Sequence, residues 1–367
     1  MKPRNAAALI LIILVASTVP LAQATKSQRY VFRTTYTFEN RGEEPFTLMD
    51  EDLAIVIFPD DEWQKATLRN SSHGIVREYT DEDGNDLALP DIPAVLPGGT
   101  AITFSIEYDI TSSSRDRPSI KLTEAEGPSE IPSQLVEEYC VQSESFFWND
   151  EIEELAQELT SDETTALGML TNLVDWTYSS LTYCNFEFPN YPNDTLESGQ
   201  GDCDDQSILL ISMLRSLGIP AFLQVGVVFN DRIGSDNPSW DGHLMIHTEG
   251  MGWHAWTMVY IPPWGWIPVD LTLASGQDPM DILDAAPEYD SYIVRALDVS
   301  EQAYIGDSRA SRERYIESDV YVTVVEVTLD VEAGTDWMKI IYYVLGAAAV
   351  GAFALYFITM GRKGNQL

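Results

Sequence analysis

Basic residues are scarce in this sequence. Lysine and arginine together number 21, of which 6 are lysine, against 58 aspartate and glutamate residues, so the formal net charge is −37. A protein that binds nucleic acid needs clustered Lys and Arg to neutralise phosphates, and the composition therefore excludes nucleic acid as a partner. We interpret the acidic surface as an adaptation to salt; acidity suited to a cationic substrate remains the alternative.

Charge is also missing from a stretch at the N-terminus. Lys2 and Arg4 precede an apolar segment, and Ala22-Gln23-Ala24 fits a small-residue cleavage site. This order is typical of a secretory signal peptide, which we predict over residues 1–24. An uncleaved N-terminal anchor is the alternative interpretation.

A second uncharged run lies near the C-terminus. Residues 340–360 carry no charge, and at ~1.5 Å per residue they reach the ~30 Å of a bilayer hydrocarbon core. Arg362 and Lys363 follow directly, which places that end in the cytoplasm. We therefore predict a transmembrane helix over residues 337–361 and a cytoplasmic tail over 362–367. The protein is expected in the cell membrane as a single-pass protein with extracellular N-terminal domains.

Cysteine is rare as well, with three residues at Cys140, Cys184 and Cys203. An odd number in an exported protein leaves at least one thiol without an intramolecular partner. A Cys140–Cys184 disulfide that leaves Cys203 free is the simplest arrangement, although a sequence supplies no geometry to test it.

The segment between the two ends is long enough for two cores. Alternating apolar residues and turn signals predict a β-sandwich domain over residues 25–112. Residues 113–130 are rich in serine, proline and charge and are expected to be a linker. A second domain with helices and strands then covers 131–317. Residues 318–336 alternate as a strand and lead into a membrane stalk.

Cys203 lies where a helix is predicted to begin. Asp202 can cap that helix, and Gly218 with Pro220 ends it. The unpaired N–H groups of a first helical turn stabilise a thiolate, the reactive form of cysteine. The negative charges of Asp204 and Asp205 disfavour the thiolate. A cationic partner such as protonated histidine is therefore needed.

Two later segments supply such a partner. Residues 243–247 and 253–260 are predicted to form two strands of a hairpin that turns at 249–252. His254 lies on the second of these strands. A third strand follows and ends at Asp270, whose carboxylate needs a partner if it is buried. A cysteine at a helix start, a histidine on a strand and an aspartate at the next strand end suit a thiol–imidazole nucleophile.

Four motifs now stand in a fixed order: G-D-C-D-D from residue 201, R-S-L-G-I-P-A-F from 215, W-H-A-W from 253 and G-W-I-P-V-D from 265. This order resembles the transglutaminase-like superfamily, whose core is a rearranged relative of papain. The resemblance covers about residues 150–290. It implies that Cys203 is a nucleophile, His254 a general base and acid, and Asp270 the residue that orients the imidazole. The expected fold class is α+β, a papain-like transglutaminase core after a β-sandwich domain, with a C-terminal transmembrane helix.

The function predicted from this resemblance is thiol acyl transfer at the cell surface. The first choice is a cysteine protease or amidase that acts on a protein or peptide substrate through the catalytic triad Cys203, His254 and Asp270. One alternative is a protein-glutamine transamidase that forms crosslinks. Another is a non-catalytic surface binding or adhesion module that retains the fold.

The remaining histidines of this region do not suit a metal site. His243 and His247 could join His254, but four residues along a strand span about 13 Å, which one metal ion cannot easily bridge. We therefore expect no metal and no cofactor.

Overall fold

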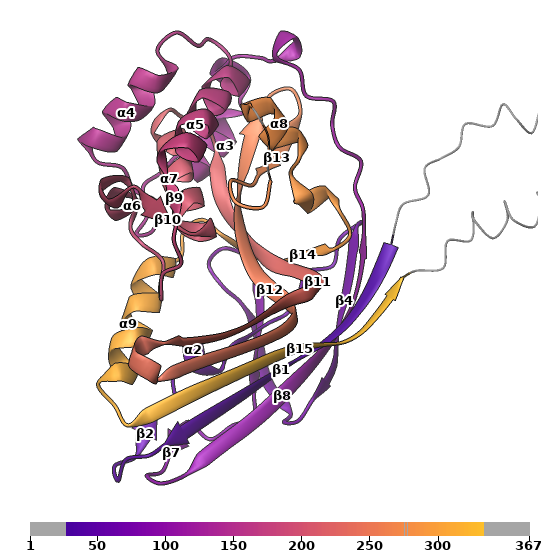
Figure 1. The fold of residues 1–367 in the computed structure, drawn as a ribbon, viewed down its shortest axis with the longest axis vertical. Coiled ribbons are helices and arrows are strands. Elements are labelled where there is room, and N and C mark those ends of the chain that lie inside the picture. Colours follow the sequence, from indigo (N-terminus) through magenta and orange to yellow (C-terminus); the bar gives the residue numbers. More distant parts are fainter. Residues whose placement is uncertain (1–26, 275, 277, 334–367) are drawn as a thin grey trace, which may run out of the picture. The chain divides into compact units, whose positions relative to one another are not determined.

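The computed structural model describes residues 27–274, 276 and 278–333. The stretch from Ser27 to Glu332 forms one compact unit, a curled mixed sheet with helices packed against part of it (Figure 1). The strands are β1 Ser27–Asn40, β2 Phe46–Thr47, β3 Ile55–Val56, β4 Gln64–Ser71, β5 Ile75–Thr80, β6 Asp86–Pro90, β7 Val95–Leu96, β8 Ala101–Ser113, β9 Thr182–Tyr183, β10 Gln200–Gly201, β11 Ala221–Ser239, β12 Leu244–Ile261, β13 Gly265–Val269, β14 Ile293–Val299 and β15 Val320–Ala333.

In the sequence, most of the helices fall between strands β8 and β11. The α-helices are α2 Asp50–Leu53, α3 Ser133–Tyr139, α4 Asp150–Thr160, α5 Ala166–Ser180, α6 Pro192–Ser198, α7 Cys203–Ser216, α8 Pro279–Asp284 and α9 Tyr304–Ile316. Short 3-10 turns are η1 Leu122–Glu124, η2 Pro128–Glu130, η3 Trp240–Gly242 and η4 Pro287–Tyr289. The helix predicted from Cys203 onward is confirmed as α7, and the strand predicted from residue 318 is confirmed as β15.

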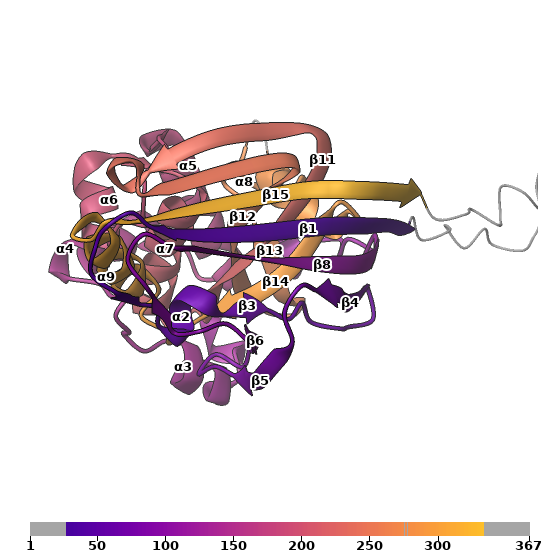
Figure 2. The same ribbon diagram turned by 90° about the horizontal axis from the view of Figure 1, so that it is seen from below.

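The large sheet joins strands from both halves of the sequence. Its order is β14-β11-β12-β15-β1-β8-β4, and β13 pairs with β12. Strand β15 runs parallel to β12 on one side and lies beside β1 on the other (Figure 2). The separate β-sandwich domain predicted over residues 25–112 is therefore wrong, because its strands β1, β4 and β8 continue the sheet of the following segment. Alternation along a strand identifies its two faces but carries no information on which neighbour it pairs with.

Two large hydrophobic cores hold the unit together. The first lies between helices α4, α5 and α7 and strands β11–β13, where Leu170, Leu210 and Val259 are fully buried. The second packs β1 and β8 against the small sheet β3-β6-β5 and includes Phe32 from β1 and Phe229 from β11. Because the second core mixes side chains from both halves of the chain, those halves cannot bury their apolar faces independently.

Strand β12 corrects a second prediction. The two segments that contain His243–His247 and Trp253–Tyr260 are not a hairpin, because residues 244–261 form one strand that pairs with β11 along nearly all its length. Gly250 has a positive φ of 76° and lies where β15 approaches, since a Cβ there would come within 2.9 Å of the Thr328 Cβ. The glycines thus allow a bend and a close approach within one strand rather than a chain reversal.

The membrane prediction is also corrected. In the part of the chain that the structure describes, no helix is long and apolar enough to cross a membrane. The longest of these helices, α5, has 15 residues, about 22 Å at ~1.5 Å per residue against the ~30 Å required. The predicted signal peptide (1–24), transmembrane helix (337–361) and cytoplasmic tail (362–367) lie outside the described residues. The single-pass topology and cell-membrane localisation are therefore unsupported and are withdrawn.

Candidate active site

Cys203 opens helix α7 in a tightly packed turn. Asp202 is the N-cap residue, and its N–H donates to Asp205 Oδ2 at 3.2 Å, so a side chain three positions into the turn holds the helix start. Gly201 precedes the cap in β10, where a Cβ would lie 2.7 Å from the Asp205 Cβ. The Asp202 carboxylate accepts the N–H of Phe186 at 3.3 Å. These contacts explain locally why a glycine and two aspartates surround the cysteine.

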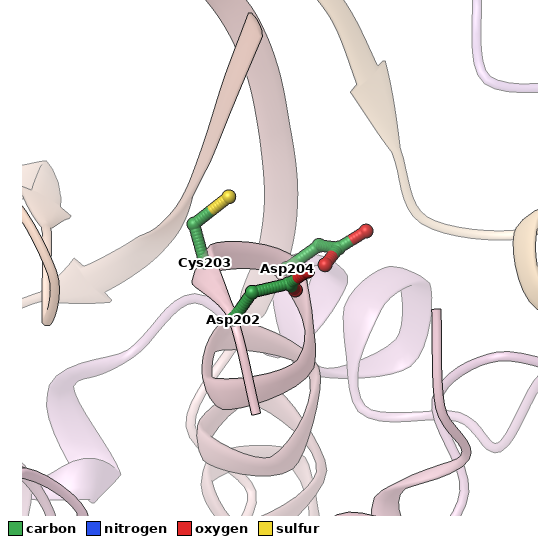
Figure 3. Close-up of side chains that lie close together, drawn as sticks. All are labelled: Asp202, Cys203 and Asp204. Carbon is green, nitrogen blue, oxygen red and sulfur yellow. The ribbon is translucent and has the colours of Figure 1, made fainter. Parts of the chain in front are cut away.

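The surroundings of Cys203 oppose ionisation of its thiol. Burial, followed by the charges of Asp204 and Asp202, raises the pKa of Cys203 well above its ordinary value, while the N–H groups of Ala255 and Asp204 act in the other direction. Figure 3 shows the two carboxyl groups next to each other at the first turn of α7, with the Cys203 side chain diverging from them. The helix start alone therefore does not produce a thiolate.

The Asp202 carboxyl group is protonated. Burial, together with a hydrogen bond and repulsion from Asp204, raises the pKa of Asp202 to about 10, so Asp202 keeps its proton at neutral pH. Asp204 accepts the Tyr304 O–H at 2.9 Å on Oδ2. The carboxyl group of Asp202 is thus neutral beside the thiol at neutral pH.

His254 and Asp270 form a buried pair. His254 lies on β12 and is 6% exposed, whereas Asp270 follows β13 and is 0% exposed. The Nε2 atom of His254 lies 2.7 Å from Asp270 Oδ2. Strand β13 pairs with β12 from Thr257 to Ile261, which brings the end of one strand beside the histidine of the other.

Asp270 is held by donors on both carboxyl oxygens. Its Oδ1 accepts the N–H groups of Thr272 at 2.9 Å and Leu273 at 2.8 Å. Burial alone would raise the pKa of Asp270, but hydrogen bonds from His254, Glu288 and Leu273 outweigh it and hold the pKa at about 2. Asp270 is therefore an anion with a fixed orientation, and it fixes the ring of His254.

A cavity of about 340 Å³ contains both Cys203 and His254. The other lining residues are mainly apolar or small: Tyr183, Val228, Ile233, Gly252, Trp253, Thr272 and Leu273. Apart from His254, none of the lining residues in the described part of the chain is basic. The cavity therefore offers a nucleophile and an imidazole beside an apolar wall.

Trp253, which lines this cavity, is held in place by a hydrogen bond to strand β15. Its indole N–H lies 3.0 Å from both carboxyl oxygens of Glu326 on β15, and Glu326 is 3% exposed. Because β15 also pairs with β12, the same strand completes the sheet and positions a side chain of the cavity. Sequence reasoning placed Trp253 in a core or groove wall but did not find its partner.

Among the residues that the structure describes, two groups of side chains bring metal-ligand types together. Within each, the ligand atoms lie within 4.8 Å of one another: Asp202, Cys203 and Asp204, and His254, Asp270 and Glu288. In the second group the histidine and Asp270 already bind each other, which explains their proximity without an ion.

His243, which follows η3, and His247 on β12 have different partners. The His243 ring stacks on Tyr321 and its Nδ1 lies 2.9 Å from the Val320 carbonyl oxygen. His247 Nδ1 lies 2.5 Å from Asp236 Oδ1. These contacts are separate from those of His254.

The predicted disulfide is wrong. Cys140, Cys184 and Cys203 are all free thiols. Cys140 follows helix α3 and Cys184 follows strand β9, and burial raises the pKa of Cys140 to about 11. The odd number of cysteines suggested one pair and one free thiol. A disulfide also needs the two cysteines at a suitable distance and orientation, which a count of cysteines does not provide.

Comparison with known proteins supports the resemblance seen in the motifs. The family model of the transglutaminase-like superfamily matches residues 153–271, about a third of the chain. No functionally curated protein matches the sequence.

Solved structures show only distant similarity. A structure from Cytophaga hutchinsonii, described as a candidate cysteine protease, has 16% identity and a TM-score of 0.49, covering 83% of this chain and 91% of that one. The periplasmic domain of TgpA from Pseudomonas aeruginosa has 14% identity and a TM-score of 0.31, covering 74% and 92%. A candidate protease from Parabacteroides distasonis has 12% identity and a TM-score of 0.27, covering 76% and 68%.

The matched segment runs from helix α4 to the residue after Asp270 and so contains α7, β11, β12 and β13. Cys203, His254 and Asp270 all lie inside it. Residues 153–271 of this chain match the core of the transglutaminase-like superfamily.

Proposed function

We propose that the protein is a thiol acyl-transfer enzyme, first of all an amidase or peptidase. The observation that carries this proposal is one cavity lined by both Cys203 and His254, with the far nitrogen of His254 bound to the buried anion Asp270. A cysteine nucleophile needs a base within reach and a group that orients that base. The match to the transglutaminase-like superfamily supports the same assignment.

In this mechanism the Cys203 sulfur attacks the carbonyl carbon of an amide. His254 takes the thiol proton on Nδ1, because Nε2 is bound to Asp270, and passes it to the leaving amine. The acyl group remains on Cys203 as a thioester. Water then attacks the thioester, releases a carboxylic acid and returns the proton to sulfur. The backbone N–H of Cys203, at the start of α7, is suited to bind the oxyanion.

The charges around Cys203 favour activation during attack over a stable ion pair. Burial and Asp204 both raise the pKa of the thiol. A proton acceptor at the sulfur is therefore required at the moment of reaction, and His254 provides it. Asp270 stabilises the imidazolium that results.

The cavity suggests the substrate class. Val228, Ile233 and Leu273 supply apolar contacts, and Trp253 offers a flat ring that is 42% exposed. We infer that the acyl side of the substrate is apolar or neutral, because no cation among the described lining residues would bind a carboxylate there.

The test uses the full-length protein and a panel of peptide amides that carry apolar or acidic residues on the acyl side. The expected result is product release together with an acyl adduct located on Cys203 by mass spectrometry. A His254→Ala variant should react roughly 10²–10⁴-fold more slowly. An added primary amine separates the two reaction types, since hydrolysis yields the acid and transamidation a new amide.

Cys203→Ala and an exposed control, Asp175→Asn on α5, complete the design. Turnover that persists unchanged in Cys203→Ala would rule out the proposed nucleophile. A wild-type protein that forms no adduct with any amide, although correctly folded, would favour a binding module instead.

A further inference from the structure

Glu288 is a buried acid that the proposed mechanism leaves without a role. It lies in the 3-10 turn η4 and is 2% exposed. Neither of its carboxyl oxygens accepts a hydrogen bond from a donor atom of the described structure. One of them nevertheless lies within 4.8 Å of ligand atoms of both Asp270 and His254. A buried carboxyl group without a donor needs an explanation.

The explanation is a shared proton between two carboxyl groups. Two buried carboxylates in contact cannot both ionise, so one of them keeps its proton. Asp270 receives the donors, from the His254 ring and from two backbone N–H groups, and so carries the charge. Burial, and then the charge and hydrogen bonding of Asp270, raise the pKa of Glu288 well above its ordinary value. A protonated Glu288 needs no external donor, which accounts for its apparent lack of partners.

The surrounding charges are few. Besides Asp270 and His254, the titratable groups near Glu288 are Arg115, Tyr289 and Tyr292, which interact with it electrostatically. The positive charge of Arg115 lowers the pKa of Glu288, but burial and Asp270 outweigh it. Arg115 and Glu288 both line a second cavity of about 300 Å³.

We propose that Glu288 is a positioning residue that remains a neutral carboxylic acid and donates its O–H to Asp270, thereby holding the Asp270 carboxylate on the His254 ring. This inference rests on the proposed function, because it assigns a role within the same Cys203–His254–Asp270 site. The neutral form matters: a second anion at Glu288 would repel Asp270 and compete for the imidazole, whereas a neutral donor fixes Asp270 without adding charge.

Two substitutions of Glu288 in the full-length protein separate donation from charge and from packing. Glu288→Gln keeps a neutral donor of similar shape, whereas Glu288→Leu keeps the volume and removes the donor. The rate of iodoacetamide labelling at Cys203 should stay within about threefold of wild type for Glu288→Gln. It should fall roughly tenfold or more for Glu288→Leu, the factor that one hydrogen bond to a charged group carries. Glu130→Gln and Glu130→Leu, at the exposed end of the 3-10 turn η2, are matched controls.

Equal slowing by both Glu288 variants would mean that Glu288 acts as an anion and would overturn the inference. A folded Glu288→Leu protein that labels like wild type would overturn it as well. If Glu288→Leu does not fold, infrared spectroscopy decides: the carbonyl absorption of protonated acids at neutral pH should lose the Glu288 component in Glu288→Gln, while the Asp202 component remains. An unchanged band would show that Glu288 is ionised. The infrared band does not depend on the reactivity of Cys203. If the labelling rate of the wild-type thiol did not depend on His254, the proposed function would be refuted, but the band would still report whether Glu288 is protonated.

Discussion

Asp204 is the charged residue that most directly governs the reactivity of Cys203. After burial, its charge is the largest cause that raises the pKa of the thiol. The neighbouring Asp202 keeps its proton at neutral pH, because burial and Asp204 raise its pKa to about 10. In the proposed mechanism, the reactivity of the cysteine is thus set by the balance between the charge of Asp204 and the imidazole of His254.

Replacing Asp204 by asparagine should make the thiol easier to ionise. The amide still accepts the Tyr304 O–H but carries no charge, so the pKa of Cys203 falls and labelling at neutral pH becomes faster. The measurement is the pH dependence of iodoacetamide labelling, with Asp175→Asn on α5 as the control. A pH profile that stays in place or moves upward would contradict this assignment of the charge.

The predicted site residues came from local sequence patterns. Cys203 follows a helix cap, His254 lies in a strand and Asp270 ends the next strand, so each has a context that a sequence displays. Glu288 has no such context. It is one of many acidic residues in an acidic stretch, and its burial depends on contacts with a strand that is distant in sequence.

At the scale of elements, the start of α7 shows why the motif contains a glycine. A Cβ at Gly201 would overlap the Asp205 side chain at 2.7 Å and would lie 3.2 Å from Thr195 Cγ2. Gly201→Ala should therefore lower the free energy of unfolding by about 1–3 kcal/mol, the usual cost of forcing an extra carbon into a packed site.

Urea unfolding followed by circular dichroism measures this loss. Gly74→Ala is the matched control, because nothing lies within 4 Å of a Cβ there and the backbone φ is not positive. The control should change stability little. Equal stability of Gly201→Ala and wild type would mean that the turn before Cys203 adjusts freely.

The elements were predictable to different degrees. Helix α7 was found because its cap and its terminating glycine are local signals. Strand β12 was misread as a hairpin because Gly250 and Gly252 resemble a turn, whereas pairing with β11 continues past them. A turn signal indicates what the backbone tolerates, and the pairing partner decides whether the chain reverses.

At the scale of the whole molecule, the buried acids shape the dependence of stability on pH. The raised pKa values of Asp202 and Glu288 mean that the folded state keeps protons which the unfolded chain loses above about pH 4. The stability that these two groups contribute is complete below about pH 4. It declines as the pH rises toward their pKa values in the folded state. Asp270 acts oppositely: with a pKa of about 2, its contribution is complete above about pH 4 and is lost as the pH falls toward 2.

The free energy of unfolding should therefore decrease between about pH 4.5 and 7, and Glu288→Gln should make that decrease shallower. Denaturant titrations at several pH values and constant ionic strength measure it. An identical slope in Glu288→Gln and wild type would mean that Glu288 loses its proton normally in the folded state.

The excess of carboxylates should also make stability depend on salt. A net charge of −37 repels itself, and the screening length falls from about 10 Å at 0.1 M salt to about 3 Å at 1 M. The midpoint of thermal unfolding should rise over this range of sodium chloride. A protein that is fully stable without added salt would contradict the salt-adapted interpretation of the composition.

The arrangement of the whole sheet was the least predictable feature. The strand β15 was recognised from its alternation, but its position between β12 and β1 joins two segments that the sequence suggested were separate domains. Which edges pair is decided by the shared second core, to which β1, β8 and β11 all contribute. Such long-range complementarity leaves little trace in any single segment.

The most direct test of the Cys203–His254 site is the rate of iodoacetamide labelling of Cys203 against pH, in the full-length protein and in His254→Ala. The account predicts that His254 accepts the thiol proton during labelling, so the rate collapses in the variant while both proteins remain folded. Slow labelling that is equal in the two proteins would contradict it, because His254 would then not act on the cysteine.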